Sequence, residues 1–291
     1  MEKKLLALFG LKFNPFAPEI ATEALLTTPK MESFAWRIEH AHVKSGGFAL
    51  ITGEPGTGKS VALRLLATRL AALRDVTVGS ITHPQSNLAD FYREMGDVFG
   101  IPLKPHNRWA GCKALRASWQ NHIETTLSRP VLMIDEAQEM GSAVLSELRI
   151  LASTEFDSKI ILSVILAGDA RLTERFRRDD LLPLGSRIRT RLTMDYATPE
   201  ELKACLKHLS AAAGNTRLLT PELAATLADH AGGNYRTLTT MAAELLAIAA
   251  QRELSQLDEK LYFDVFVTPR NLRAAIPTAR TRTHASAKNR S

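Results

Sequence analysis

The chain has 291 residues, of which 45% are hydrophobic and 23% are charged, and its formal net charge is +6. This length suits a sizeable core with a second, smaller domain, and the composition is that of an ordinary globular protein rather than a disordered or fibrous one. No run approaches the roughly 20 apolar residues of a membrane span, and no signal peptide follows Met1, so we expect a cytoplasmic protein with no membrane contact.

The first elements are an apolar segment over residues 5–16 and a helix over residues 31–42. The segment ends in the turn signal Asn14-Pro15. In the helix, Phe34, Ile38 and Ala41 recur at helical spacing. A short buried strand is then expected over residues 47–52.

Residues 53–60 fit the pattern G-x-x-x-x-G-K-[ST] at every required position. An apolar helix is expected to begin directly after them. This order of strand, loop and helix would place bound phosphates at a helix N-terminus, where backbone N–H groups and the helix dipole favour anions. Glycines in the loop let the backbone take positive φ and approach the phosphates closely. The sequence therefore predicts a nucleotide phosphate-binding loop.

Two side chains of the loop have roles of their own. Lys59 is expected to reach the β- and γ-phosphates, and the Ser60 hydroxyl is expected to bind Mg²⁺. The N-terminal segment then either packs near the adenine or forms a hydrophobic strap on the core. With ATP and Mg²⁺ as cofactors, the loop residues expected to bind the nucleotide are Gly53, Glu54, Pro55, Gly56, Thr57, Gly58, Lys59, Ser60 and Val61.

A strand over 76–81 and a helix over 88–99 lead to a basic loop over residues 101–116. The loop contains Lys104, Arg108, Trp109 and Lys113, and no acidic residue occurs between Asp97 and Glu124. Such a loop can follow a nucleic-acid backbone, with lysines and arginines on phosphates and an aromatic ring against a base or sugar. The alternative is a solvated loop whose Trp109 is anchored in the core.

Four apolar residues, 131–134, end in the adjacent carboxylates Asp135 and Glu136. A continuous apolar run is typical of a strand buried on both faces, so this is a Walker B pattern. Asp135 is expected to hold Mg²⁺ and Glu136 to polarise the attacking water. Together with the phosphate loop, these residues predict one phosphoryl-transfer site that hydrolyses ATP.

A further buried strand over 160–167 ends at Gly168-Asp169, and a basic sequence at Arg187, Arg189 and Arg191 precedes the last strand, 192–196. Asp169 is either a sensor that faces the γ-phosphate or the N-cap of the next helix. The arginines either serve catalysis or form a basic strand edge on the surface.

The pattern changes to helices alone from Thr198. Residues 198–200 and 220–222 each read as an N-cap, a proline and an acid, which mark helix starts. We therefore predict a phosphate-loop core over 1–197, an all-helical lid over 198–268, and a tail over 269–291. The tail contains six basic residues and no acidic one, so the first 268 residues are neutral overall. Its composition predicts disorder in isolation.

Taken together, the phosphate loop, the Walker B strand, the Ser186-Arg187 pair and the lid sequence Gly233-Asn234-Tyr235-Arg236 resemble an AAA+ ATPase over about residues 5–268. The sequences at 13–16, 46–48, 135–138 and 166–168 resemble the ExeA-like group. That group includes general-secretion ATPases, and its relatives include transposition regulators of the TnsC, TniB and Mu B types. The resemblance implies a parallel sheet flanked by helices, with a small helical lid.

The resemblance also assigns roles to two arginines. Arg187 corresponds to the arginine finger that reaches the γ-phosphate of a neighbouring subunit, with Arg189 and Arg191 as other candidates, and Arg236 corresponds to the second sensor in the lid. Both assignments imply a homo-oligomer, a ring or a filament, with ATP between subunits. Asp169 departs from the family, which often has a neutral polar residue there.

The leading hypothesis is an ATP-dependent regulator that assembles on duplex DNA and directs a transposase or a similar DNA-processing partner. Lys104, Arg108 and Lys113 are the candidate DNA contacts, together with the tail. One alternative is a secretion-type ATPase that acts on envelope assembly, against which the chain lacks a membrane span and a following periplasmic domain. The other is a nucleotide-controlled adaptor with little hydrolysis, against which stands Glu136.

Overall fold

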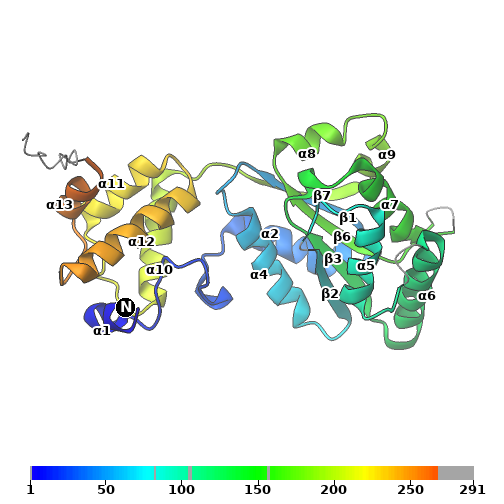
Figure 1. Ribbon diagram of the computed structural model, residues 1–291, viewed down its shortest axis with the longest axis horizontal. Helices are drawn as coiled ribbons and strands as arrows, with labels where there is room; N and C mark the ends of the chain where they lie inside the picture. Colours follow the sequence, from blue (N-terminus) through cyan, green and yellow to red (C-terminus); the bar gives the residue numbers. More distant parts are fainter. Residues whose placement is uncertain (1, 82, 104–106, 156–157, 268–291) are drawn as a thin grey trace, which may run out of the picture.

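The computed structural model describes residues 2–81, 83–103, 107–155 and 158–267. Five parallel strands form the central sheet in the order β2-β3-β6-β1-β7, with helices on both faces (Figure 1). The prediction of a parallel α/β sheet flanked by helices is thus confirmed. The strands are β1 (Gly47–Gly53), β2 (Val76–Ile81), β3 (Arg129–Ile134), β6 (Ser163–Gly168) and β7 (Ile188–Met194).

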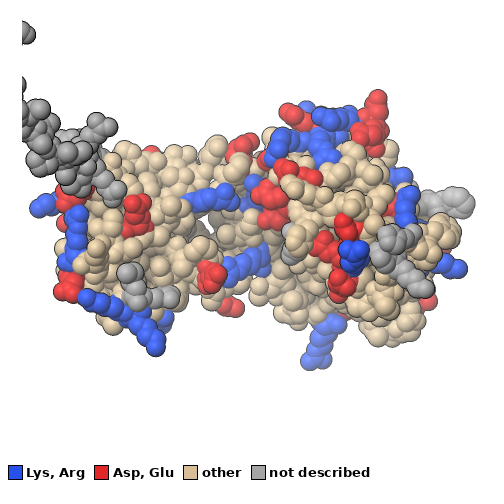
Figure 2. Space-filling view, viewed as in Figure 1, with Lys and Arg blue, Asp and Glu red and all other residues tan. Residues whose placement is uncertain are grey.

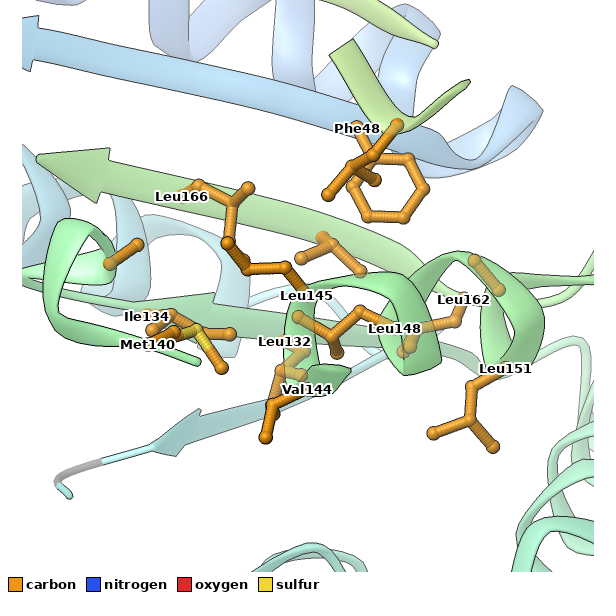
Figure 3. Packing of buried hydrophobic residues seen from close by; sticks show 14 of the residues in the cluster. Phe48, Leu132, Ile134, Met140, Val144, Leu145, Leu148, Leu151, Leu162 and Leu166 are labelled. Carbon is orange, nitrogen blue, oxygen red and sulfur yellow. The ribbon is translucent and has the colours of Figure 1, made fainter. Parts of the chain in front are cut away.

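The three inner strands owe their apolar sequences to burial on both faces. Successive side chains of a strand point to opposite faces, and the core divides accordingly. Leu132 and Ile134 of β3 pack in one cluster, whereas Val131 and Met133 pack in another on the opposite face. Figure 3 shows the first cluster, in which β1, β3 and β6 meet apolar side chains of α7 (Ser142–Ala152).

Helices cover the two faces of the sheet unequally. The face with α7 also carries α5 (Leu88–Phe99) and α6 (Arg108–Thr126). The opposite face carries α2 (Pro29–Arg37) and α4 (Lys59–Ala71). Shorter elements complete the domain: the single π-turn η2 (Ile38–His42), α3 (Val43–Ser45), η3 (Ala137–Glu139), the small antiparallel pair β4 (Ser153–Thr154) and β5 (Lys159–Ile160), α8 (Ala170–Arg175) and α9 (Leu182–Gly185).

The segment predicted to be a lid is helical among its described residues, and its first helix begins at Pro199. Thr198 forms a capping box with Glu201, and Thr220 caps the second helix through Leu223 N. These caps satisfy N–H groups that the first turn leaves unpaired. The lid consists of α10 (Pro199–Ala212), α11 (Pro221–Ala231), α12 (Tyr235–Gln251), α13 (Glu259–Tyr262) and η4 (Phe263–Val267) (Figure 1).

The N-terminal segment packs against the lid rather than as a strap on the sheet domain. Helix α1 (Glu2–Phe9) and the residues after it contribute Leu5, Phe9 and Phe16 to the apolar cluster of the lid. Leu245 and Leu246 of α12 belong to the same cluster. Helix α1 contacts α12 directly. The short turn η1 (Thr22–Ala24) then returns the chain toward α4.

The prediction of a basic loop over residues 101–116 is wrong for its second half, which is helical. Helix α6 begins at Arg108, and the Asn107 side chain caps it by accepting from Ala110 N at 2.9 Å. The alternative that Trp109 anchors the segment in the core is also wrong, because 79% of Trp109 is exposed. The helical side that faces the core is instead formed by Cys112, Leu115 and Trp119.

Candidate functional site

The phosphate loop curls around the amino group of Lys59. Lys59 Nζ donates to the carbonyl oxygens of Gly53 at 2.9 Å and Glu54 at 3.1 Å. Gly56 and Gly58 have φ of 83° and 101°, in the left-handed region that favours glycine. The loop therefore has the glycine conformations and the position at the start of α4 that a site for phosphates requires.

The lid contacts the loop directly at Gly56. Asn234 Nδ2 donates to Pro55 O at 2.9 Å, and Tyr235 N donates to Gly56 O at 3.0 Å. A Cβ on residue 56 would lie 2.1 Å from Asn234 Oδ1. Gly56 is thus required both by its backbone conformation and by the close approach of the lid. Arg236, predicted to be the second sensor, is exposed one residue farther along α12.

The carboxyl ends of three neighbouring strands bring the other predicted residues to the loop. Thr52 of β1 pairs with Gly168 of β6, and Ile134 of β3 pairs with Leu166 of β6. Asp135, Glu136 and Asp169 follow these strand ends, so they lie along the same edge of the sheet as the phosphate loop. Residues predicted from separate motifs are therefore brought together.

Gln138 is a residue of this site that the sequence argument did not assign. Its Nε2 donates to the Glu136 carboxylate, and its Oε1 accepts from Asp169 N at 3.3 Å. Gln138 is 8% exposed and lies in η3, where its own carbonyl accepts from Arg175 at 2.7 Å. A buried side chain with this many partners has a fixed orientation. The available signal was an amide side chain two residues after Glu136.

Asp169 acts as the N-cap of α8. Its carboxylate accepts from Arg171 N at 2.9 Å and from Arg171 Nε at 2.9 Å. Burial would raise the pKa of Asp169, but the hydrogen bonds from Arg171 and the charges of Arg171 and Lys59 outweigh burial, and the pKa is lowered. Asp169 is therefore ionised at neutral pH. The N-cap interpretation is confirmed, and the geometry directs this carboxylate to Arg171 rather than to a phosphate.

A cavity of about 560 Å³ opens beside the phosphate loop and is large enough for a nucleotide. Lys59, Glu136 and Arg236 are among the residues that line it. The N-terminal segment forms part of its wall, which the sequence left open as one of two possibilities. Arg64 of α4 holds that segment by donating to Ile20 O and, at 3.2 Å, to Thr22 Oγ1. Apolar walls suited to a base come from Phe16, Ile20, Leu25, Leu26, Leu209 and Tyr235.

The oxygen donors beside the phosphate loop fit Mg²⁺ held through a nucleotide. Mg²⁺ in such sites takes one or two protein oxygens, phosphate oxygens and waters, rather than a cage of protein ligands. Ser60 is exposed at the start of α4, and Asp135 is half-buried at the end of β3. Within the described residues no group of three or more His, Cys, Asp or Glu side chains could hold a metal alone. Ser60 and Asp135 would hold the ion, which would neutralise phosphate charge.

Arg187 lies at the opposite end of β1 from the phosphate loop. The strand pairing places Phe48, at the start of β1, beside Ile188. The seven residues of β1 span about 20 Å, so Arg187 is too far to reach a phosphate bound in its own chain. Arg187, Arg189 and Arg149 of α7 line a hollow of about 210 Å³, and Arg187 donates to Pro183 O. Arg191 does not line this hollow.

The candidate DNA contacts have different settings. Lys104 and the tail lie outside the described residues. Arg108 donates to Glu147 from Nε at 3.0 Å and from a terminal nitrogen, and Tyr92 OH donates to the same buried carboxylate. This network holds α6 against α5 and α7, and it pairs the exposed Arg108 side chain with the buried Glu147. Lys113 is exposed on α6. DNA contact by this segment stays a prediction.

Comparison with known proteins identifies the relatives of this chain. A family model described as an AAA domain matches residues 41–176. General secretion pathway protein A of Aeromonas hydrophila is 28% identical over 248 residues, which are 84% of this chain and 44% of that protein. The chain therefore spans less than half of the length of that relative.

Solved structures show the same fold at low identity. An Aeropyrum pernix ORC2 protein with ADPNP and ADP superposes with a TM-score of 0.68 at 16% identity, over 85% of this chain and 69% of that chain. Cdc6p from Pyrobaculum aerophilum superposes with a TM-score of 0.67 at 16% identity, over 84% of this chain and 67% of that chain. The Aeropyrum pernix ORC1 protein in complex with DNA superposes with a TM-score of 0.64 at 16% identity, over 86% of this chain and 67% of that chain. Residues 41–176 thus match the model of an AAA domain, the fold is the AAA+ fold of the ORC and Cdc6 structures, and the sequence is similar to that of general secretion pathway protein A.

Proposed function

We propose that the protein hydrolyses ATP in the cavity beside the phosphate loop. The observation that carries this proposal is the convergence of Lys59, Glu136 and Arg236 on one cavity with apolar walls. Lys59 would bind the β- and γ-phosphates. Glu136 would accept the proton of the attacking water, and Gln138 would hold that carboxylate in place. Arg236 would connect the γ-phosphate to the lid.

We propose further that a complete site forms between two copies of the chain. Arg187 is separated from its own phosphate loop by the length of β1, as an arginine that acts on a neighbour would be. A cation supplied to the γ-phosphate in this way can raise the hydrolysis rate about 10³- to 10⁵-fold. Nucleotide binding would then promote assembly into a ring or a filament.

The assembled form would bind duplex DNA and direct a transposase or a similar DNA-processing partner. Support comes from the basic tail, from Lys113 and the exposed Trp109 on α6, and from solved structures of the same fold, one of Drosophila ORC bound to DNA and one of ORC1 in complex with DNA. Phosphate contacts supply affinity that depends on salt but little on sequence. Choice of target would therefore depend on the partner or on DNA shape.

Electron microscopy and anisotropy of labelled duplex DNA test this function. ATP should induce rings or filaments on the DNA, and the affinity should fall steeply as salt rises. Glu136→Gln, which keeps the nucleotide but loses the base, should remain trapped on DNA. DNA binding that is independent of ATP, or no DNA binding in any nucleotide state, would contradict the proposal.

Relationship to general secretion pathway protein A favours a second candidate function, an ATPase of envelope assembly. Within the described residues no helix is long and apolar enough to cross a membrane. This function predicts the same ATP hydrolysis and the same contact between copies, but no response to DNA. ATPase activity measured with and without duplex DNA separates the two candidates, since only the DNA regulator should be stimulated.

A further inference from the structure

Residues 15–28, called here the linking segment, lie between the lid and the sheet domain and contact both. The segment follows α1, which packs on α12 of the lid, and leads into α2, which packs on the sheet. Its short turn η1 contacts α10 of the lid and α4 of the sheet domain. The chain therefore crosses from the lid to the sheet domain at this segment (Figure 1).

The linking segment forms one wall of the cavity beside the phosphate loop. Figure 2 shows the molecule hollowed between the lid and the sheet domain, and both of these parts contribute residues to the cavity. The segment contributes apolar side chains, among them Phe16, Ile20, Leu25 and Leu26. Apolar walls of this kind are where a nucleotide base would pack. The position of the segment should therefore affect how tightly the base is held.

Arg64 of α4 fastens the linking segment to the sheet domain. A terminal guanidinium nitrogen donates to Ile20 O, and Nε donates to Thr22 Oγ1 at 3.2 Å. Hydrogen bonds from a charged donor are stronger than those between neutral groups. Because Ile20 itself lines the cavity, the first of these bonds fixes the backbone of the cavity wall.

Arg64 also lies close to the phosphate loop along α4. Ser60 and Arg64 are four residues apart, so they share one face of the helix, and both line the cavity. The same helix begins at Lys59, directly after the loop. Arg64 therefore connects the wall expected to contact the base with the helix that begins at the phosphates.

We propose that Arg64 is a positioning residue for the nucleotide base, which holds the linking segment at the distance from the phosphate loop that a bound nucleotide requires. The proposal rests on the proposed ATP site and adds to it a residue outside the phosphate loop. Base and phosphates are bound by different groups of the protein. Loss of Arg64 should therefore weaken binding of a nucleotide and leave binding of its phosphates alone unchanged.

Calorimetric titrations with a non-hydrolysable ATP analogue and with inorganic tripolyphosphate, both with Mg²⁺, separate the two contributions. Full-length Arg64→Met keeps much of the apolar stem and loses the donors. It should bind the analogue about 10-fold more weakly and tripolyphosphate as wild type does. Arg64→Lys keeps one charged donor group and should lose less affinity. In ATPase assays of Arg64→Met, KM should rise with kcat nearly unchanged, as for a contact that is equal in the ground and transition states.

Thr22→Val tests the contact from the side of the linking segment. This change removes the acceptor of Arg64 Nε and leaves Arg64 in place, so the analogue should bind about 3-fold more weakly and tripolyphosphate as in wild type. The double variant should bind the analogue as Arg64→Met does, since both changes break one contact. Arg116→Met is the matched control. Arg116 is also half-buried and donates to a backbone carbonyl, that of Ser153, but it does not line the cavity, so both affinities should stay unchanged.

Two results would overturn the proposal. Equal losses of affinity for the analogue and for tripolyphosphate in Arg64→Met would show that Arg64 acts on the phosphates. Wild-type affinity for the analogue in Arg64→Met or in Thr22→Val would show that the linking segment keeps its position without this contact. Absence of analogue binding by wild type would instead remove the proposed ATP site itself.

Discussion

At the scale of single residues, the hydrogen bond that Gln138 donates to the Glu136 carboxylate can be tested directly. Leu has nearly the shape of Gln but cannot donate to the Glu136 carboxylate, so Gln138→Leu should leave the base free to turn. Misplacement of a catalytic group by about 1 Å can lower the rate about 100-fold. We therefore expect kcat to fall about 10- to 100-fold. Steady-state ATPase assays check this.

The affinity for ATP should not change in Gln138→Leu, because Gln138 does not line the cavity. The double variant with Glu136→Gln should be no slower than Glu136→Gln alone, since Gln138 acts through that carboxylate. A further decrease in the double variant, or a weaker affinity for ATP in the single one, would contradict the role. In Gln138→Leu the Asp169 N–H also loses the Gln138 side chain as its acceptor, which should lower the free energy of unfolding by about 1 kcal/mol.

A second single-residue prediction concerns the dependence of stability on pH. His42 is 2% exposed, and its Nε2 has no hydrogen-bond partner among the described residues. Burial lowers the pKa of His42 from 6.5 to about 4, and the charge of Arg189 contributes to the decrease. The unfolded chain therefore binds the proton first as pH falls. Stability conferred by the neutral imidazole is complete above pH 6.5 and is lost as pH falls toward 4.

The difference between these two pKa values corresponds to about 3 kcal/mol across the window. His42→Leu keeps the site filled and removes the titrating group, so its stability should decrease less between pH 7 and pH 4.5. Urea unfolding of both proteins at the two pH values provides the measurement. Equal decreases in the free energy of unfolding of wild type and His42→Leu would show that carboxylates, and not His42, cause the loss of stability in acid.

At the scale of elements, the N-terminus of α12 connects the lid to the phosphate loop. Asn234 caps α12 by accepting from Thr237 N at 3.1 Å and also donates to Pro55 O. Asn234→Ala should lower the stability of the lid by about 1 kcal/mol, as other lost N-caps do. It should also weaken ATP binding about 5-fold, because one charge-neutral hydrogen bond contributes about 1 kcal/mol. Calorimetric titration with a non-hydrolysable ATP analogue measures the second effect.

Thr220→Ala is the matched control for this prediction. Thr220 caps α11 in the same lid by accepting from Leu223 N at 3.2 Å, and it makes no contact with the phosphate loop. The two variants should therefore lose similar stability, and only Asn234→Ala should bind the analogue more weakly. Equal affinities would show that the contact between Asn234 and Pro55 does not contribute to nucleotide binding.

The elements also show how far the sequence predicts this molecule. Local signals were sufficient for the phosphate loop, the strand that ends in Asp135 and the capped helices of the lid, because each depends on neighbours in the chain. The contact between Asn234 and Pro55 and the packing of α1 on α12 join residues about 180 or more positions apart, and no short pattern encodes them. The sequence left open whether Trp109 is buried or exposed. The pairing of Arg108 with Glu147, which is 39 positions away, helps to determine which face of α6 packs on the core.

At the scale of the whole molecule, the proposed site is divided between the two ends of the sheet. The phosphate loop and Glu136 lie at the carboxyl end of the strands, and Arg187 lies at the amino end. Two different surfaces that complement each other build a head-to-tail contact, which forms a ring or a filament and not a closed two-fold dimer. Every copy would then present one nucleotide to a neighbour and one arginine to another.

Mixing two inactive variants tests this arrangement. Lys59→Ala loses the nucleotide but keeps Arg187, and Arg187→Ala keeps the nucleotide but loses the finger. Each alone should hydrolyse ATP about 10³-fold more slowly than wild type. In an equal mixture, random head-to-tail contacts pair an intact nucleotide site with an intact arginine at about a quarter of the interfaces. The mixture should therefore regain about a quarter of the wild-type rate, whereas a mixture that stays inactive would show that Arg187 does not act on the neighbour's site.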